Sequence, residues 1–278
     1  MTIAAGRFSE QVVMITGAAG GLGTLMRPRL AEGDRVLRLL DIADIPAAGE
    51  GEHVEVVQAS VTDPAAMEAA MADVDAVIHL GGHSLEQPWA QILDVNINGT
   101  HVVLEAARRA GVKRVLLASS NHAVGYTERA DGNADDYLFP KPDTYYGVSK
   151  VAMEALGSLY ANRYGMDVIA IRIGSCFEKP RDARMLATWL SPDDAARLFE
   201  ACIAAPNPGF RVVWGVSDNT RRWFSLDEAY ALGYESKDDA EAYAGDVEAQ
   251  DPSSLAQKYL GGVWCGPEFD TAVKEAGQ

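Results

Sequence analysis

The sequence predicts an α/β protein with a doubly wound, mostly parallel sheet, helices on both faces and a small C-terminal cap. Three observations support this fold class. Short β-branched runs alternate with stretches of helical length through the first 175 residues, a glycine cluster follows the first run, and no internal repeat interrupts the alternation. Right-handed crossovers then place helices on both faces of the sheet.

Six apolar runs are predicted as strands, and helical stretches separate them. The strands are Val12–Thr16, Arg35–Asp41, Val54–Ala59, Asp75–Leu80, Arg114–Ser119 and Val168–Ile173. Helices are expected over Leu22–Glu32, which ends at Gly33, over Pro64–Ala72, over Pro88–Ala110 and within Asp143–Tyr164. Gly111 and Gly165 close the last two.

The alternation breaks after about residue 175. A helix over Ala195–Ala205 begins near Ser191, and Arg211–Gly215 is a further candidate strand. The stretch Tyr234–Asp251 is acidic and polar, and is interpreted as a solubility feature. We therefore expect one dinucleotide-type domain over residues 1–278, in which residues 176–278 supply a substrate-side cap and a tail.

Charge and cysteine content exclude several classes of function. Lys and Arg number 24 against 40 Asp and Glu, a net charge of −16, which argues against nucleic acid and against anionic membrane surfaces. No stretch is apolar enough for a transmembrane helix, and the N-terminus lacks a signal-peptide pattern. The three cysteines, Cys176, Cys202 and Cys265, are odd in number and widely spaced, with no CxxC pair. This indicates a reduced cytoplasmic protein without a structural metal site.

The glycine cluster has the spacing of a phosphate-binding turn. Residues 17–23 fit GxxGxxG, directly after a strand and at the start of a helix, as in the Rossmann-type fold. Gly17 permits a sharp turn, Gly20 permits close approach of a pyrophosphate, and Gly23 permits close packing of helix on strand. The helix N-terminus adds free N–H groups. The alternative is a glycine-rich turn that binds nothing.

Asp41 ends the second predicted strand, 18 residues after Gly23. A carboxylate at this position accepts hydrogen bonds from the hydroxyls of the adenosine ribose and repels a 2′-phosphate. No arginine follows it, so the sequence favours NAD over NADP as cofactor. The alternative is a plain surface turn residue.

Tyr146 and Lys150 form a YxxxK pair, whose members share one helix face. A lysine ammonium beside a phenol is expected to lower the pKa of the tyrosine from about 10 and make it a general base. Ser120, at the end of the fifth strand, can hold the reacting hydroxyl against Tyr146. Tyr145 lacks the four-residue spacing to Lys150 and is rejected as the base.

The glycine turn, the strand-five serine and YxxxK, in this order, resemble the short-chain dehydrogenase/reductase family in its extended branch. The resemblance covers residues 12–175 and implies catalysis by Ser120, Tyr146 and Lys150. It also implies an NAD site formed by Gly17, Gly20, Gly21, Leu22, Gly23, Asp41, Ser60, Val61, Leu80, Gly81, Gly82, Ser119, Tyr146, Lys150 and Ile173. One departure concerns the adenine, which many members meet with an aspartate after the third strand; here that stretch reads Ala59-Ser60-Val61.

Several further stretches are similar to the uronate dehydrogenases of this family: residues 80–84, 119–126, 172–176, 184–191 and 212–215. This resemblance implies NAD-dependent oxidation of C1 of glucuronate or galacturonate to an aldarolactone, with Arg184 on the substrate carboxylate. The implied substrate residues are Ser84, Ser120, Asn121, His122, Tyr146, Ser175 and Arg184.

Other interpretations of these residues stay open. Arg184 could instead form a salt bridge, His122 could be structural, and the small polar residues could cap turns. Cys176 is expected to be a packing residue. The tryptophans Trp189, Trp214, Trp223 and Trp264 could cover the site or fill the core, and the core is the favoured interpretation. The rival functions are a nucleotide-sugar epimerase or reductase and a dinucleotide-binding redox sensor. A homo-oligomer is expected, because exposed long helices in this fold often form dimers.

Overall fold

The structure is a computed structural model that describes residues 11–31, 35–129 and 134–270. It contains a seven-stranded sheet in the order β3-β2-β1-β4-β5-β6-β9, and every pair of neighbours is parallel. The strands are β1 (Val12–Thr16), β2 (Val36–Asp41), β3 (Val54–Gln58), β4 (Ala76–His79), β5 (Arg114–Ser120), β6 (Asp167–Ile173) and β9 (Phe210–Gly215). The predicted fold class and all seven candidate strands are confirmed, with bounds that differ by at most one residue at either end.

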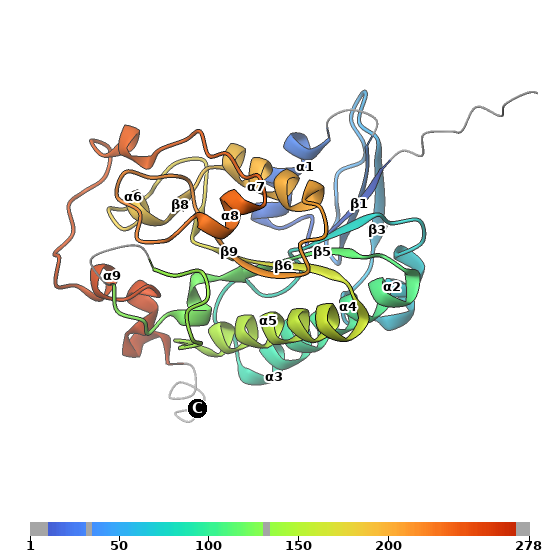
Figure 1. Cartoon of the computed structure of the whole chain (residues 1–278), viewed down its shortest axis with the longest axis horizontal. Helices are drawn as coiled ribbons and strands as arrows, with labels where there is room; N and C mark the ends of the chain where they lie inside the picture. Colours follow the sequence, from blue (N-terminus) through green and yellow to red (C-terminus); the bar gives the residue numbers. More distant parts are fainter. Residues whose placement is uncertain (1–10, 32–34, 130–133, 271–278) are drawn as a thin grey trace, which may run out of the picture.

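Helices cover both faces of this sheet, as predicted (Figure 1). One core cluster joins the sheet to α1 (Gly21–Leu30) and α7 (Pro192–Ala204). A second cluster joins the other face to α2 (Pro64–Ala70), α4 (Gly99–Ala110) and α5 (Tyr145–Tyr164). The strand order reverses between β1 and β4, and folds of this kind bind ligands in the crevice at that point.

Three expectations fall partly outside the described residues. Helix α1 ends at Leu30, and the predicted end at Glu32 and Gly33 lies in the undescribed residues 32–34. The residues 1–10, to which the signal-peptide prediction refers, and the last eight residues of the tail are outside as well. In the parts of the chain that the structure describes, no helix is long and apolar enough to cross a membrane.

The helix predicted over Pro88–Ala110 is not a regular α-helix. It consists of α3 (Trp89–Gln91), a π-helical segment η1 (Ile92–Asn98) and α4. The widened turn places Asn96 against the loop after β4, where its side chain accepts from the His83 N–H at 2.8 Å and donates to the His83 carbonyl at 3.0 Å. The hydrophobic period alone gave no sign of this segment, and π-helical turns are frequent near functional sites.

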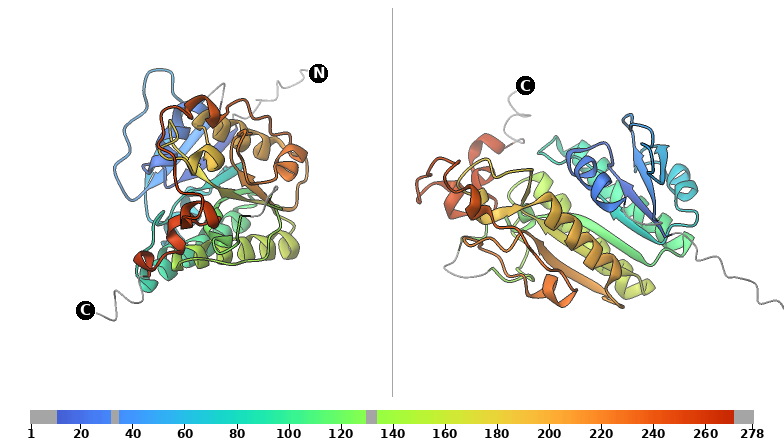
Figure 2. Two further views of the ribbon diagram at one scale, coloured as in Figure 1. Left: turned by 90° about the vertical axis from the view of Figure 1, so that its left-hand side faces the viewer. Right: turned by 90° about the horizontal axis from the view of Figure 1, so that it is seen from above.

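The C-terminal third gathers over one end of the sheet (Figures 1 and 2). It contains a parallel pair, β7 (Ser175–Cys176) and β8 (Trp189–Leu190). Its helical pieces are α6 (Met185–Thr188), α8 (Asp227–Ala231), η3 (Ala240–Tyr243), α9 (Leu255–Lys258), η4 (Gly262–Cys265) and η5 (Pro267–Phe269). A short 3₁₀ turn, η2 (Asn121–Val124), follows β5 beneath them.

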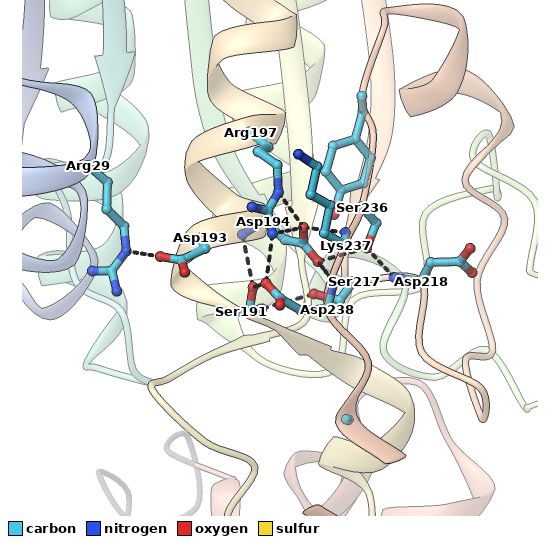
Figure 3. Close-up of polar contacts among 12 residues, drawn as sticks. Arg29, Ser191, Asp193, Asp194, Arg197, Ser217, Asp218, Ser236, Lys237 and Asp238 are labelled. Atoms are coloured by element: carbon cyan, nitrogen blue, oxygen red, sulfur yellow. Dashed lines mark hydrogen bonds and ion pairs between the residues drawn. The ribbon is translucent and has the colours of Figure 1, made fainter. Parts of the chain in front are cut away.

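The acidic stretch after Tyr234 does more than confer solubility (Figure 3). Asp194 of α7 is fully buried, and its carboxylate accepts from the Ser236 hydroxyl at 2.7 Å and from the backbone N–H groups of Lys237 and Asp238 at 2.9 and 3.1 Å. Arg197 pairs with the same carboxylate at 2.7 Å. These contacts fasten the cap to the helix layer of the sheet.

Candidate active site

The glycine-rich turn after β1 packs tightly against the loop after β4. Gly17 has φ +70°, and a Cβ there would lie 2.7 Å from the backbone nitrogen of Gly81. A Cβ on Gly23 would lie 2.6 Å from the Cα of Ala18. Both positions therefore require glycine, for the sharp turn and for the close packing that the sequence predicted.

The N-terminus of α1 is suited to an anionic group. The helix begins without a side-chain cap and without an acidic residue in its first turn. A Cβ on Gly21 would meet no described atom within 4 Å, so the outer side of the turn is open. Free N–H groups and the positive end of the helix dipole at this point fit a pyrophosphate.

Asp41, at the end of β2, lies on the glycine turn. Its Oδ2 accepts from the Ala19 N–H at 3.0 Å and its Oδ1 from the Ala43 N–H at 3.0 Å. The carboxylate is therefore fixed in place beside the glycine-rich turn. Two carboxylate oxygens offer about four acceptor positions, so acceptor capacity is left for the two hydroxyls of a ribose.

The remaining residues predicted for NAD line the same edge of the sheet. Val61 packs on Gly81, where a Cβ would lie 2.9 Å from Val61 Cγ1, and the Ser60 hydroxyl bonds that of Thr62 at 2.8 Å. Leu80, Gly81 and Gly82 follow β4, Ile173 ends β6, and Leu22 lies in the first turn of α1. The Ser119 hydroxyl points elsewhere, because it donates to Glu154 at 2.6 Å.

The structure brings Ser120, Tyr146 and Lys150 together. Thr144 caps α5 by accepting from the Gly147 N–H at 3.1 Å, which sets Tyr146 in the first turn. Tyr146 is 8% exposed and hydrogen-bonds to Ser120, and the Lys150 ammonium lies 5.2 Å from the centre of its ring. These three residues form the arrangement that the sequence predicted.

Tyr145 is directed away from this group. Its ring packs edge-on against Trp89 with ring centres 5.4 Å apart. Glu86, which the sequence reasoning missed, accepts from the N–H groups of Tyr145 and Tyr146 at 3.1 and 2.7 Å. A carboxylate at a helix N-terminus is favourable, and here it fixes the start of α5.

Burial changes the acid–base properties of Tyr146 and Lys150. It raises the pKa of Tyr146 to about 12, against the lowering effect of the hydrogen bond from Ser120. It also lowers the pKa of Lys150 to about 8, against the raising effect of Glu154. The expected lowering of the tyrosine pKa is therefore wrong for the protein by itself, because the cost of burying a phenolate outweighs its stabilisation.

A buried ion pair lies beneath Lys150 and was not predicted. Both Glu154 oxygens accept from Arg172 at 2.8 Å, and the arginine is also held over the Trp214 ring. Glu154 follows Lys150 by four residues, so it shares the helix face of Tyr146 and Lys150. That spacing is the signal by which the sequence could have revealed it.

His122 lies between Tyr146 and the C-terminal segment. Its Nδ1 is 2.6 Å from Asp143 Oδ2, and its ring stacks on Trp264 with centres 4.1 Å apart. Trp264 also meets Tyr146 edge-on at 5.7 Å. The interpretation of Trp264 as a core residue is wrong, since it is half-buried at the site; Trp189, Trp214 and Trp223 are buried as expected.

Asn121 and Arg184 meet at one backbone carbonyl. Leu260 O accepts from Asn121 Nδ2 at 2.7 Å and from Arg184 Nη2. Arg184 Nε is buried without a hydrogen-bond partner among the described residues, and burial lowers the pKa of the guanidinium. An unpaired buried donor of this kind suits an anionic ligand.

Two predicted substrate residues lie further out. Ser175 is buried on β7, where its hydroxyl bonds that of Thr188 at 3.1 Å, and Ser84 is exposed in the loop after β4. Cys176 follows Ser175 on β7, and burial raises the pKa of its thiol to about 12, as expected for a packing residue. No group of His, Cys, Asp and Glu among the described residues could hold a metal ion.

Comparisons with known proteins identify the family of the chain. The sequence profile of the "NAD dependent epimerase/dehydratase family" matches residues 13–223. A uronate dehydrogenase of Pseudomonas putida is 44% identical over 259 residues, covering 91% of this chain and 94% of that protein. The resemblance found in the sequence is thereby confirmed.

Two solved structures are also similar. The glucuronic acid dehydrogenase of Chromohalobacter salexigens has a TM-score of 0.88 at 41% identity and covers 94% of this chain and 99% of that one. A mutant uronate dehydrogenase of Agrobacterium tumefaciens, complexed with NAD, has a TM-score of 0.87 at 38% identity, over 92% and 97%. The chain therefore belongs to the NAD dependent epimerase/dehydratase family, and its uronate dehydrogenase relatives match it over nearly its whole length.

Proposed function

We propose that this protein oxidises the C1 hydroxyl of a hexuronic acid, glucuronate or galacturonate, to the aldarolactone with NAD. The observation that carries the proposal is the meeting of two groups at one site. Tyr146, Ser120 and Lys150 supply acid–base chemistry, and Arg184 places a cation with an unpaired N–H beside the loop that follows Ser120. A protein with a net charge of −16 needs such a fixed cation to bind a substrate carboxylate.

The edge of the sheet between β1 and β4 is the proposed NAD site. We expect the helix N-terminus of α1 to hold the pyrophosphate and Asp41 the adenosine ribose. When bound, NAD supplies the ring that accepts the hydride from C1. The residues proposed to line it are Gly17, Gly20, Gly21, Leu22, Gly23, Asp41, Ser60, Val61, Leu80, Gly81, Gly82, Ser119, Tyr146, Lys150 and Ile173.

The chain's own residues would bind and deprotonate the sugar. Arg184 binds the carboxylate, and Ser120 and Tyr146 contact the C1 hydroxyl. Tyr146 then takes the hydroxyl proton as general base. Because burial by itself holds the pKa of Tyr146 near 12, the phenolate needs a positive charge at its side, and Lys150 is the cation that lies there. The lactone that forms can leave the site and hydrolyse in water.

The remaining polar side chains would hold the other hydroxyls of the sugar. Asn121, His122, Ser175 and Ser84 are the candidates, and the first two are the better supported, because both lie in the turn η2 directly after Ser120. Ser175 and Ser84 rest on the resemblance to the uronate dehydrogenases. Sugar recognition by several neutral hydrogen-bonding groups around one charged anchor is typical of such sites.

The test is the change in absorbance at 340 nm when purified protein meets NAD and either uronate. We expect NADH formation with glucuronate or galacturonate, and much less with glucose or galactose, or with NADP. Equal activity on the neutral sugars would overturn the role of the carboxylate. No NADH with any of them, while a nucleotide sugar is converted, would move the assignment to an epimerase or reductase.

We also propose that the enzyme is a cytoplasmic homo-oligomer. Leu93 and Leu159 are exposed along a groove of about 520 Å³ between η1, α4 and α5, which is almost wholly apolar and also includes Ile97 and Leu156. Apolar patches of this kind commonly mark interfaces. Light scattering of the purified protein should give at least a dimer at micromolar concentration, and Leu159→Glu should lower the mass; a wild-type monomer would contradict this.

A further inference from the structure

Two consecutive glycines of the C-terminal segment lie between two charged side chains of the site. A Cβ on Gly261 would overlap the carboxylate of Asp143, the partner of His122. A Cβ on Gly262, whose φ is +64°, would lie 2.8 Å from Arg184 Nε and 3.1 Å from its Cδ. A side chain at Gly261 would also meet the Gly125 backbone at 2.9 Å, and one at Gly262 would displace the Arg184 side chain in addition to straining the backbone.

The residue before them contacts the same site through its backbone. Leu260 O accepts from Asn121 Nδ2 at 2.7 Å and from Arg184 Nη2. The turn of Leu260, Gly261 and Gly262 thus touches Asn121, Asp143 and Arg184 at once, although more than 75 residues separate it from each of them in the sequence.

The turn is itself held firmly. The Gly261 N–H donates to the Gly125 carbonyl at 2.9 Å and the Leu260 N–H donates to the Thr127 carbonyl at 3.0 Å. Leu260 is 1% exposed and belongs to the main hydrophobic core. The carbonyl that receives Arg184 is therefore a fixed acceptor, joined to the segment that continues from Ser120.

We propose that the turn Leu260–Gly262 positions Arg184 and so determines specificity for the carboxylate of the substrate. By occupying Nη2 and packing along the side chain, it fixes the guanidinium with Nε free to donate to a carboxylate oxygen. The rotamer entropy of the arginine is then lost on folding and not on binding, which favours the charged sugar over its neutral counterpart. This inference rests on the proposed function and extends it to residues that do not touch the substrate.

The test compares Gly262→Ala with Gly233→Ala. Gly233 also has a positive φ, +94°, but a Cβ there would meet nothing within 4 Å, so it controls for backbone strain. We expect Gly262→Ala to lower the ratio of kcat/KM for galacturonate to that for galactose by about 10–100-fold, mainly through a higher KM, with the Kd for NAD unchanged. The control should keep the wild-type ratio. An equal loss on both sugars, or an unchanged ratio, would overturn the proposal.

A second measurement does not depend on turnover. The Nε–H of Arg184, assigned by its loss in Arg184→Lys, should give a sharp and slowly exchanging NMR signal in the wild-type protein. A signal averaged by rapid exchange would mean that the turn does not fix the side chain. If the wild type proves inactive on uronates while this signal is present, the proposed function fails and the positioning of Arg184 stands.

Discussion

The ammonium group of Lys150 donates to the carbonyl oxygen of Ala118 at 2.6 Å and lies 5.2 Å from the centre of the Tyr146 ring. The lysine is thus tied to the end of β5, the strand that also carries Ser120. Strand and helix together place a cation beside the phenol. Burial penalises both the ammonium and the phenolate. Glu154 offsets part of this cost for the ammonium, and the hydrogen bond from Ser120 offsets part of it for the phenolate.

Removal of the phenol oxygen should abolish turnover without harming the fold. Tyr146→Phe keeps the edge-on contacts of the ring with His122 and Trp264 and removes the proposed general base. We expect kcat to fall by about 10²–10⁴-fold, with the Kd for NAD within a few-fold of wild type. Tyr145→Phe is the matched control and should retain activity. A Tyr146→Phe enzyme with wild-type kcat would refute the assignment of the base.

Asp41 should govern the choice between NAD and NADP. Asp41→Ala removes the acceptor for the ribose hydroxyls and the charge that repels a 2′-phosphate. We expect kcat/KM to fall with NAD and to rise with NADP, so that the ratio between them decreases by at least about tenfold. Steady-state kinetics with both cofactors measure this, and Asp44→Ala, a nearby acid not assigned to the cofactor, is the control. An unchanged ratio would show that the carboxylate serves the turn alone.

The buried histidine of the sheet should limit acid stability. His79 is fully buried, its ring bonds Thr16 and Thr100 at 2.8 and 3.2 Å, and burial lowers its pKa to about 3. Between pH 6.5 and 3 the unfolded chain binds a proton here that the folded chain does not. Stability must therefore fall as the pH falls, by up to about 1.4 kcal/mol per pH unit from this group.

Urea denaturation between pH 7 and pH 5 would measure this slope in the wild type. A variant such as His79→Asn is expected to be less stable at pH 7 but to show a shallower slope. Equal slopes in both proteins would assign the acid sensitivity to other groups.

The ion pair under Lys150 should be sensitive to the loss of one partner. Glu154→Gln leaves Arg172 buried with an uncompensated charge, and we expect the free energy of unfolding to fall by about 3–5 kcal/mol. Glu105→Gln, which affects the surface pairs with Arg108 and Arg109, should cost less than about 1 kcal/mol. Urea denaturation distinguishes the two, and similar losses would contradict the burial argument.

Local patterns were sufficient to predict the sheet and the meeting of Ser120, Tyr146 and Lys150. The strands of the sheet, the glycine turn and the spacing of Tyr146 and Lys150 are properties of short segments, so the sequence displays them directly. The π-helical segment at Ile92–Asn98 was missed, because the apolar residues there are compatible with an ordinary helix.

Long-range contacts explain what the sequence could not reveal. The side chains of His122 and Asp143 contact each other across 21 positions of the sequence. The Asn121 side chain donates to the Leu260 carbonyl across 139 positions. No periodicity encodes such meetings. The first arises when the loop before α5 folds against the turn after β5, and the second when the C-terminal segment folds over the ends of the strands. The same is true of Trp264, because the residues around it in the sequence gave no reason to place it beside Tyr146.

The buried carboxylate of Asp194 couples residues 236–238 of the cap to helix α7, which packs on the sheet, so we expect cap and sheet to unfold together. Its acceptor positions are filled by a hydroxyl and two backbone amides from residues 236–238. A truncated gene product that stops before residue 236 would retain this charge inside its helix layer with Arg197 as the remaining partner. Calorimetry of the intact chain should accordingly show a single melting transition, and limited proteolysis should release no durable nucleotide-binding fragment.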